Sequence, residues 1–282
     1  MTDDPRRELA EFLRTRRTRV RPQDVGLEPG PRRRVAGLRR EELALLAGVS
    51  PDYYQRMEQG RDVRPSDQVL DAIAGALNFS AEESRHLHSL AAAARTPARA
   101  RRYPPEEVPP TTLRLMNATT SPALVVGRFL DVLAWNPLAG ALLGAFAEAP
   151  QRNLLALLLH PDSDQACPDR AATVAELTGM LRAQVSAEPG HPRATELVAD
   201  LEARSGEFAA LWSRHDVEGT TRGRMRVDHP LVGELNLDWD AYPIPGAPGP
   251  VLIVYTAEPG SRDDDRLRLL AAENECAPTP AR

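Results

Sequence analysis

The stretch that decides the fold of the first half of the chain is GLRREELALLAGVSPDYYQRMEQGRDVRPS, residues 37–66. Its apolar and small residues have the spacing that two short helices need when they cross at close range, with a glycine for the tight turn between them. The residues that we expect in this core and turn are Leu43, Ala44, Leu46, Gly48, Val49, Tyr54 and Met57. The stretch therefore predicts a helix pair whose second member covers about 51–59.

The second helix of this pair leaves four residues facing outward: Pro51, Asp52, Tyr53 and Arg56. In such a pair, the N-terminal part of the second helix can enter the major groove of DNA. Asp52 could then accept a hydrogen bond from a cytosine amino group, and Arg56 suits guanine through two hydrogen bonds. Tyr53 could contact either a thymine methyl group or a phosphate. Glu42 and Glu58 are better interpreted as partners of arginines within the domain.

The surrounding sequence predicts a compact bundle of five short helices. Serines and a glycine mark the helix ends: Ser50, Ser66 and Ser80 are suited to N-capping, Pro51 fits a first helical position, and Gly60 closes a helix. Apolar spacing and these ends place the helices at about 5–19, 39–47, 51–59, 66–77 and 81–94.

Charge is distributed unevenly along the chain. The net charge is -5, but Met1 to Arg64 holds 15 Arg against 11 acidic residues, whereas Thr96 to Arg282 holds 18 Arg against 25. A nucleic-acid surface is therefore expected in the N-terminal part only. Every basic residue is Arg, which is typical of a GC-rich genome. The arginines that precede or open the helix pair, which could contact phosphates or a narrow minor groove or could form a solvated surface, are Arg32, Arg33, Arg34 and Arg39.

Composition argues against several other classes of protein. Cys167 and Cys276 lie 109 positions apart without a metal-ligand pattern, so we expect no zinc site and no disulfide framework. The N-terminus lacks the apolar core of a signal peptide, and no apolar stretch is long enough to span a bilayer. These observations predict a cytoplasmic protein without a cofactor.

The second half predicts an α+β domain over 113–275, after a proline-rich and arginine-rich linker at 96–112 and before a short tail at 276–282. The expected order is two strands within PALVVGRFLDVLAWN, a short helix begun by Pro137, two long helices, three strands and a last helix. We expect one antiparallel sheet with helices on one side. The ranges of the later elements are 169–187, 192–215, 222–228, 231–240, 251–258 and 261–273.

The segments EELALLAGVS and YYQRMEQGR resemble the Xre/lambda-repressor-like helix-turn-helix family over about Leu38 to Ser80. The resemblance implies a lambda-repressor-like bundle that binds double-stranded DNA. Pro51 departs from the polar residue of many relatives, so base readout is not assigned to it. The DNA-contacting residues that follow, beside the four arginines above, are Arg40, Ser50, Asp52, Tyr53, Arg56 and Arg61, with Arg40 and Arg61 on phosphates.

The second half is similar to the ligand-binding domain of MmyB-type regulators in SPALVVGRFLDVLAWNPLAGALL, NLLALLLHPD, FAALWSRHDV, LVGELNLDWDAY and LIVYTAEPGSRDDDRLRLLA. This resemblance implies a PAS-like antiparallel sheet with flanking helices around an apolar cavity, with a fatty-acid-like ligand. Asn136 is either a helix cap or a ligand contact, and Arg224 is a candidate partner for a carboxylate. The expected lining is Val126, Phe129, Trp135, Leu142, Phe146, Leu211, Trp212, Leu237 and Tyr255.

Two other classes of function stay open. The second half could be an enzyme, with His160 or the pair His215 and Asp216 as a catalytic base, although each fits a structural role at a helix end. Alternatively, the helix bundle could bind a protein instead of DNA. A regulator would be a homodimer on a palindromic operator, because one short recognition helix reads too few base pairs to specify a site.

Overall fold

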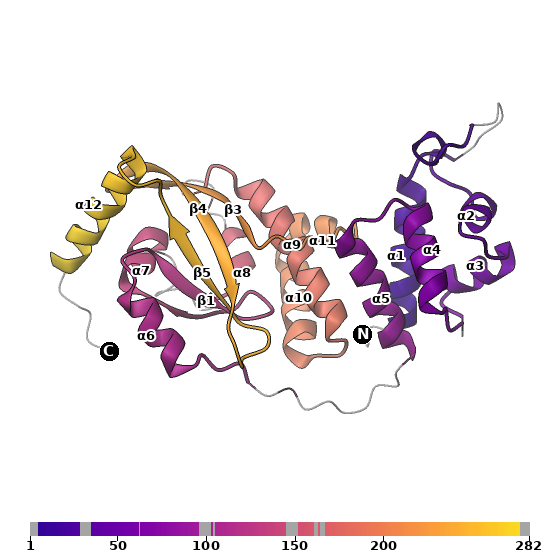
Figure 1. Ribbon diagram of the computed structural model, residues 1–282, viewed down its shortest axis with the longest axis horizontal. Helices are drawn as coiled ribbons and strands as arrows, with labels where there is room; N and C mark the ends of the chain where they lie inside the picture. Colours follow the sequence, from indigo (N-terminus) through magenta and orange to yellow (C-terminus); the bar gives the residue numbers. More distant parts are fainter. Residues whose placement is uncertain are drawn as a thin grey trace. The chain divides into compact units, whose positions relative to one another are not determined.

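The computed structural model describes residues 5–28, 35–61, 63–95, 103, 105–144, 152–160, 163 and 167–276. Contacts divide the chain into two compact units. Unit 1 comprises residues 1–103, 182–200 and 209–219, and unit 2 comprises residues 104–181, 201–208 and 220–282. The division falls inside three helices of the second half, so those helices contribute residues to both units (Figure 1).

In the described part of the first 95 residues, five α-helices and one 3-10 helix belong to unit 1, and the five α-helices lie close to where the sequence predicts them. Their bounds are α1 Pro5–Arg19, η1 Pro22–Val25, α2 Arg40–Leu46, α3 Pro51–Glu58, α4 Asp67–Ala76 and α5 Ala81–Arg95. The predicted serine caps are confirmed. Ser50 and Ser66 accept hydrogen bonds from the third residue of α3 and α4, and Ser80 exchanges hydrogen bonds with Glu83 at the start of α5.

Two glycines shape the backbone around the helix pair, Gly48 in the turn between α2 and α3 and Gly37 against the end of α1. Gly48 follows α2 with a φ of 65°, a left-handed conformation that residues with a Cβ rarely adopt. Gly37 passes so close to the end of α1 that a Cβ atom there would overlap the backbone of Thr18. The turn is closed by a hydrogen bond from the amide of Val49 to the carbonyl oxygen of Ala44, at 2.9 Å. The predicted helix pair therefore forms, and a tight hydrogen-bonded turn joins its two helices.

The core of unit 1 extends beyond the five helices. Phe12, Leu43 and Tyr54 are completely buried in it, as the amphipathic spacing predicts. Leu46, which the sequence also places in the core, is instead 37% exposed at the end of α2. Val217 and Ala183, from the second half of the sequence, pack into the same cluster. The helical unit is thus completed by residues that lie more than 80 positions beyond α5.

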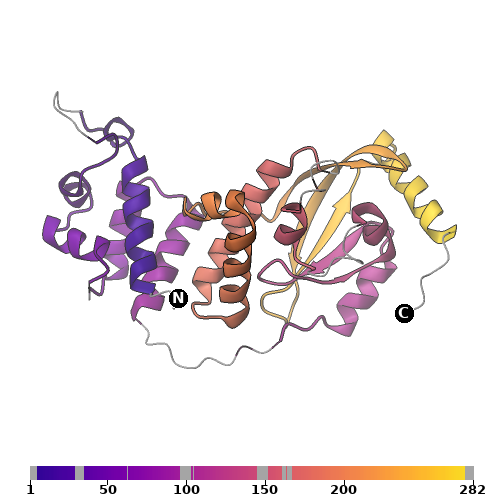
Figure 2. The same cartoon turned by 180° about the vertical axis from the view of Figure 1, so that it is seen from behind.

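Unit 2 is built on a five-stranded antiparallel sheet of order β2-β1-β5-β4-β3. The strands are β1 Ala123–Val126, β2 Val132–Trp135, β3 Arg222–His229, β4 Gly233–Pro243 and β5 Val251–Thr256. The remaining helices of the chain are α6 Pro110–Ala118, α7 Pro137–Leu143, α8 Leu154–Leu158, α9 Arg170–Ala187, α10 Pro192–Arg204, α11 Gly206–Trp212 and α12 Arg262–Cys276. Figure 2 shows the sheet from the other side.

Helices lie on both faces of this sheet, so the expectation of helices on one side is wrong. Met116 of α6 packs with Ala123 and Val125 on one face. On the other face, the His229 ring is 3.0 Å from the carbonyl oxygen of Ala141 in α7. Strand β1 has four successive buried apolar residues, which is typical of a strand that is covered on both faces of the sheet.

Several elements differ from the sequence prediction, which did not include helices α6 and α8. Helix α6 begins at Pro110, inside the predicted linker, because proline is tolerated at a first helical position. The predicted helix 192–215 is two helices, since Ser205 accepts a hydrogen bond from the amide of Phe208 and so caps a new helix. Strand β4 begins at Gly233 instead of Leu231. Within the part of the chain that the structure describes, no helix combines the length and apolar character needed to cross a membrane.

Candidate nucleic-acid interface

Helix α3 has one locked face and one open face. Tyr54 is fully buried and Met57 is 3% exposed, which confirms both as core residues. Pro51, Asp52 and Arg56 are exposed on the opposite side. Residues four positions apart lie on the same face of a helix. Asp52 and Arg56 therefore belong to one outward surface.

A buried ion-pair network fixes the locked face. Glu58, at the end of α3, accepts hydrogen bonds from Arg17 of α1 at 2.5 Å and from Arg40 of α2 at 2.6 Å. Arg17 also donates to the carbonyl oxygen of Leu38, at 2.6 Å. Three helices therefore meet at one carboxylate, and the angle between α2 and α3 is held by charge-assisted hydrogen bonds.

The ionisation of this network follows from its surroundings. Burial alone would raise the pKa of Glu58, but the hydrogen bonds from Arg17 and Arg40 outweigh it and hold that pKa below its usual value. Burial and the Glu58 carboxylate raise the pKa of Tyr54 well above its ordinary range. Glu58 is therefore charged and Tyr54 neutral at physiological pH, and the prediction that Glu58 pairs with arginines is confirmed. Glu42 accepts a hydrogen bond from the backbone amide of Arg39, at 2.7 Å.

The predicted DNA-contacting residues line the open side of the helix pair. Arg39, Arg56 and Arg61 are exposed, and no ion pair to Asp52 or Arg56 occurs among the residues that the structure describes. Arg40 combines its bond to Glu58 with a side chain that is 43% exposed. The other predicted contacts are as follows: Tyr53 is half-buried, the Ser50 hydroxyl caps α3, and Arg32, Arg33 and Arg34 lie outside the described residues.

In unit 2, the strand register gathers part of the predicted ligand-binding set. Leu237 and Tyr255 share one sheet face, because Trp239 pairs with Tyr255 and successive side chains alternate. The same alternation places Val126 and Trp135 on that face. Phe129 and Leu142 are also buried in unit 2. We call these six residues, four on one sheet face and two buried elsewhere in unit 2, the sheet-face set.

The other predicted lining residues are not brought to this place. Leu211 and Trp212 belong to unit 1. Arg224 lies on the opposite sheet face, where its Nε is 3.1 Å from the Asp238 carboxylate, so its partner in this structure is a residue of the same sheet. Phe146 lies outside the described residues.

Asn136 uses all of its amide hydrogen-bonding groups within the protein. Its Oδ1 accepts from the amides of Ala139 and Ala123, at 2.9 and 3.1 Å. Its Nδ2 donates to the carbonyl oxygens of Ser121 and Met116, at 2.8 and 3.2 Å. The residue is 2% exposed and caps α7, which supports the cap interpretation over a ligand contact.

Unit 1 carries an open cleft of about 400 Å³ beside α1. Its lining is polar, with Arg7, Glu11 and Arg14 on one side and Glu58 and Gly60 on the other. This cleft does not include the sheet-face set. Its charged walls differ from the apolar cavity that the sequence resemblance implies.

Sequence reasoning missed Arg17, although the sequence contains a signal for it. Leu9, Leu13 and Arg17 recur at intervals of four, so an arginine continues the apolar face of α1. A charged residue on a buried face needs a buried partner, and Glu58 is that partner. His215 and Asp216, a candidate catalytic pair or a structural pair by sequence, make structural contacts with arginines of unit 1.

Comparison with known families places both halves of the chain. Residues 8–87 match a helix-turn-helix domain family. Residues 108–270, more than half of the chain, match the family described as the MmyB-like transcription regulator ligand binding domain. The chain belongs to the MmyB-like transcription regulators. No curated protein matches it.

The family assignment defines the coarse function of this MmyB-like regulator. A helix-turn-helix domain joined to a ligand-binding domain is the composition of a DNA-binding transcriptional regulator. These domain types point to a regulator that is not an enzyme. The described residues hold no group of three or more His, Cys, Asp or Glu side chains arranged to bind a metal ion.

Proposed function

We propose that this MmyB-like regulator reads specific DNA sequences with α3 and that a small apolar molecule in its second half changes its affinity for DNA. The observation that carries the first part is the contrast between the faces of α3. Tyr54, Met57 and Glu58 fix one face, while Asp52 and Arg56 stay exposed on the other without ion pairs among the described residues. A rigid helix with polar side chains at its N-terminal half suits the major groove.

The proposed base contacts come from Asp52, Tyr53 and Arg56. An arginine can donate two hydrogen bonds to guanine, and a carboxylate can accept from cytosine. Arg39, Arg40, Arg61 and the arginines at 32–34 would contact phosphates or the minor groove, which positions the helix but reads no sequence. Ser50 would remain the cap that aims the first turn of α3.

The regulator would act as a homodimer on a palindromic operator. One helix of eight residues contacts only a few base pairs, and two copies would double the sequence that is read. The second half would supply the ligand pocket at the sheet-face set, in a PAS-like domain. Its apolar character favours a ligand with a long apolar chain, such as a fatty acid, over a wholly polar metabolite.

The DNA proposal is tested by fluorescence anisotropy on two duplexes, the region upstream of the chain's own gene and a shuffled sequence of equal length. Arg56→Ala should lose about 1–3 kcal/mol more affinity for the first duplex than for the second, because a base contact is lost. Arg85→Ala is a matched control, since Arg85 is also exposed and pairs with Glu82 on α5. Equal losses on both duplexes would remove Arg56 from base reading. A wild-type protein without preference for any duplex would overturn the proposed function.

The ligand proposal is tested by native mass spectrometry of the purified protein, before and after addition of a medium-chain fatty acid. A retained or added apolar mass is expected, and Leu237→Arg should abolish it because a charge would enter the sheet-face set. Arg224→Leu, on the opposite sheet face, is the control and should leave binding unchanged. Failure of the wild-type protein to retain or take up an apolar molecule would contradict apolar sensing.

A further inference from the structure

A segment from the ligand-binding half is part of the helix-turn-helix unit. We call residues 182–189 and 213–219 the docked segment; both stretches belong to unit 1. Val217 is 7% exposed within the core that Phe12 and Tyr54 also occupy. The Ser89 hydroxyl of α5 donates to the carbonyl oxygen of Ser186, at 2.9 Å. The docked segment is thus held by apolar packing and by specific hydrogen bonds.

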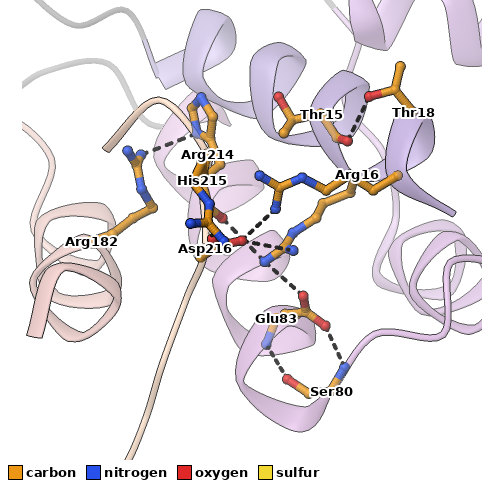
Figure 3. Close-up of polar contacts among 10 residues, drawn as sticks. Thr15, Arg16, Thr18, Ser80, Glu83, Arg182, Arg214, His215 and Asp216 are labelled. Atoms are coloured by element: carbon orange, nitrogen blue, oxygen red, sulfur yellow. Dashed lines mark hydrogen bonds and ion pairs between the residues drawn. The ribbon is translucent and has the colours of Figure 1, made fainter. Parts of the chain in front are cut away.

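Asp216 is the centre of the polar contacts between the docked segment and α1 (Figure 3). Its carboxylate is 2.5 Å from Arg19 and 3.5 Å from Arg16, both of α1, and 2.9 Å from Arg214. Arg16 also pairs with Glu83 of α5, at 2.8 Å, and donates to the carbonyl oxygen of His215. The pair of Arg16 and Glu83 is mostly buried, with side chains that are 13% and 19% exposed, whereas Arg19 and Asp216 are 38% and 33% exposed.

Arg182 joins the two stretches of the docked segment to each other. The Arg182 guanidinium stacks on the Trp212 ring, 3.8 Å from its centroid, and donates to the Trp212 carbonyl oxygen. It also lies 3.2 Å from Nδ1 of His215. Because arginine can only donate, Nδ1 of His215 must accept, which makes this histidine neutral with its proton on Nε2. His215 has a φ of 55°, a conformation that a residue other than glycine keeps only when its surroundings enforce it.

Helix α1 joins the docked segment to the recognition helix. Arg16 and Arg17 are neighbours in sequence, and the helical twist of about 100° per residue points them to different sides. Arg16 reaches Asp216 and the carbonyl of His215, while Arg17 reaches Glu58 at the end of α3. A shift of α1 at one contact must therefore move the other, because both side chains leave the same turn.

We propose that the docked segment transmits the state of the ligand-binding half to α3 through Arg16 and Arg17 of α1. Helix α9 carries the chain from residue 181 of unit 2 to residue 182 of unit 1, so a change in unit 2 reaches the docked segment along a continuous helix. The docked segment acts as a clamp: it holds α1 in the position in which Arg17 can pair with Glu58 of α3. This inference rests on the proposed DNA-reading role of α3.

The first test compares Asp216→Asn with Asp238→Asn in the full chain. Both variants lose one negative charge from an ion pair with arginine, but Asp238 lies in β4 of unit 2. Asp216→Asn should lower the ratio of upstream-duplex to shuffled-duplex affinity at least threefold, and Asp238→Asn should not. The ratio is informative because a change of net charge alters affinity for both duplexes alike. Arg19→Gln is the milder variant if Asp216→Asn does not fold.

The outcomes separate the two proposals. If folded Asp216→Asn and Arg19→Gln proteins keep the wild-type ratio of upstream-duplex to shuffled-duplex affinity, the clamp proposal is overturned. The DNA-reading proposal would then stay intact. A wild-type ratio of one would overturn the DNA-reading proposal, and the clamp with it. Circular dichroism at the assay temperature shows that each variant is folded, so a merely structural role of Asp216 would lower the melting temperature without changing the ratio.

A second test uses the reciprocity of coupling between sites. Hydrogen exchange is measured on the full chain, free and saturated with the upstream duplex. Binding of DNA at α3 should slow amide exchange in residues 213–219, and Arg17→Gln should remove this effect. Exchange at β3 is the internal control, because that strand belongs to unit 2. Unchanged exchange in residues 213–219 of a DNA-saturated protein would contradict the clamp.

Discussion

At the scale of single residues, buried polar side chains set the directions in which helices leave the core. Asn136 joins the start of α7 to Ala123 of β1 and to the carbonyls of Met116 and Ser121. Apolar packing would tolerate several helix angles here, but four directed hydrogen bonds tolerate one. Unit 2 therefore depends on this amide for the placement of α7 against the sheet.

Asn136→Ala should lower the free energy of unfolding by about 2–4 kcal/mol, because it removes a helix cap and leaves buried backbone groups without partners. Asn136→Asp keeps the capping oxygen but places a carboxylate against two carbonyl oxygens, so it should also be destabilising. Asn236→Ala, at an exposed position of β4, is the control and should change stability little. Urea denaturation measures all three. A stable Asn136→Asp protein would show that only the cap matters.

Glu58 makes the same argument for unit 1. Glu58→Gln should cost about 3–5 kcal/mol, since it leaves the buried Arg17 guanidinium without its counter-charge. Glu82→Gln removes a solvent-accessible carboxylate that pairs with Arg85 and should change stability little. Thermal unfolding by circular dichroism distinguishes them, and similar losses for both variants would contradict the importance of the network.

At the scale of elements, the sequence predicts well those helices that have polar caps. It predicts poorly those boundaries that depend on tertiary contacts. Gly48 marks the end of α2 and Ser50 the start of α3, because left-handed turns and helix caps depend on local sequence. The start of α6 at Pro110 is not local: the proline-rich stretch before it is compatible with a linker, and only packing of Met116 on the sheet favours a helix. Ser205 is a missed local signal, because its hydroxyl caps α11.

The helix pair also carries a prediction about salt. Arg40→Ala should weaken binding to upstream and shuffled duplexes by similar factors and lower the slope of log affinity against log salt by about one, because a phosphate contact is lost. The fold should survive, since Glu58 keeps its bond to Arg17. Anisotropy titrations over a range of salt concentrations measure the slope, and an unchanged slope would remove Arg40 from the phosphate contacts.

At the scale of the whole molecule, the sequence predicts two functional halves but not the exchange of residues between the compact units. Asp216 and Arg16 are 200 positions apart, and no periodicity or motif connects them. The same limit applies to the ligand-binding set: Trp212 fits an apolar lining by residue type, yet it stacks with Arg182 in unit 1. Residue type predicts burial, whereas the partner in a long-range contact depends on topology.

The two buried histidines of unit 1 predict how stability depends on pH. Burial, with added repulsion from Arg182 and Arg16, lowers the pKa of His215 to about 3, and burial with the same arginines and His215 lowers that of His86 to about 3. Unfolded histidines titrate near 6.5, so the unfolded state takes up protons first. The stabilisation is therefore complete above about pH 6.5 and is lost as the pH falls toward 3.

Between pH 6.5 and 5, the free energy of unfolding should fall by about 1.7 kcal/mol for each histidine, because the slope rises from about half its full value at pH 6.5 toward about 1.4 kcal/mol per pH unit. His215→Asn removes one titrating group and keeps a residue that tolerates the positive φ, so its slope should be about half that of the wild type. His160→Asn, in unit 2, is the control and should keep the full slope. Urea denaturation at several pH values in this window measures the slopes. A wild-type stability that is flat from pH 6.5 to 5 would mean that His86 and His215 already accept protons in the folded protein, and that the contact between Arg182 and Nδ1 of His215 does not hold the ring neutral.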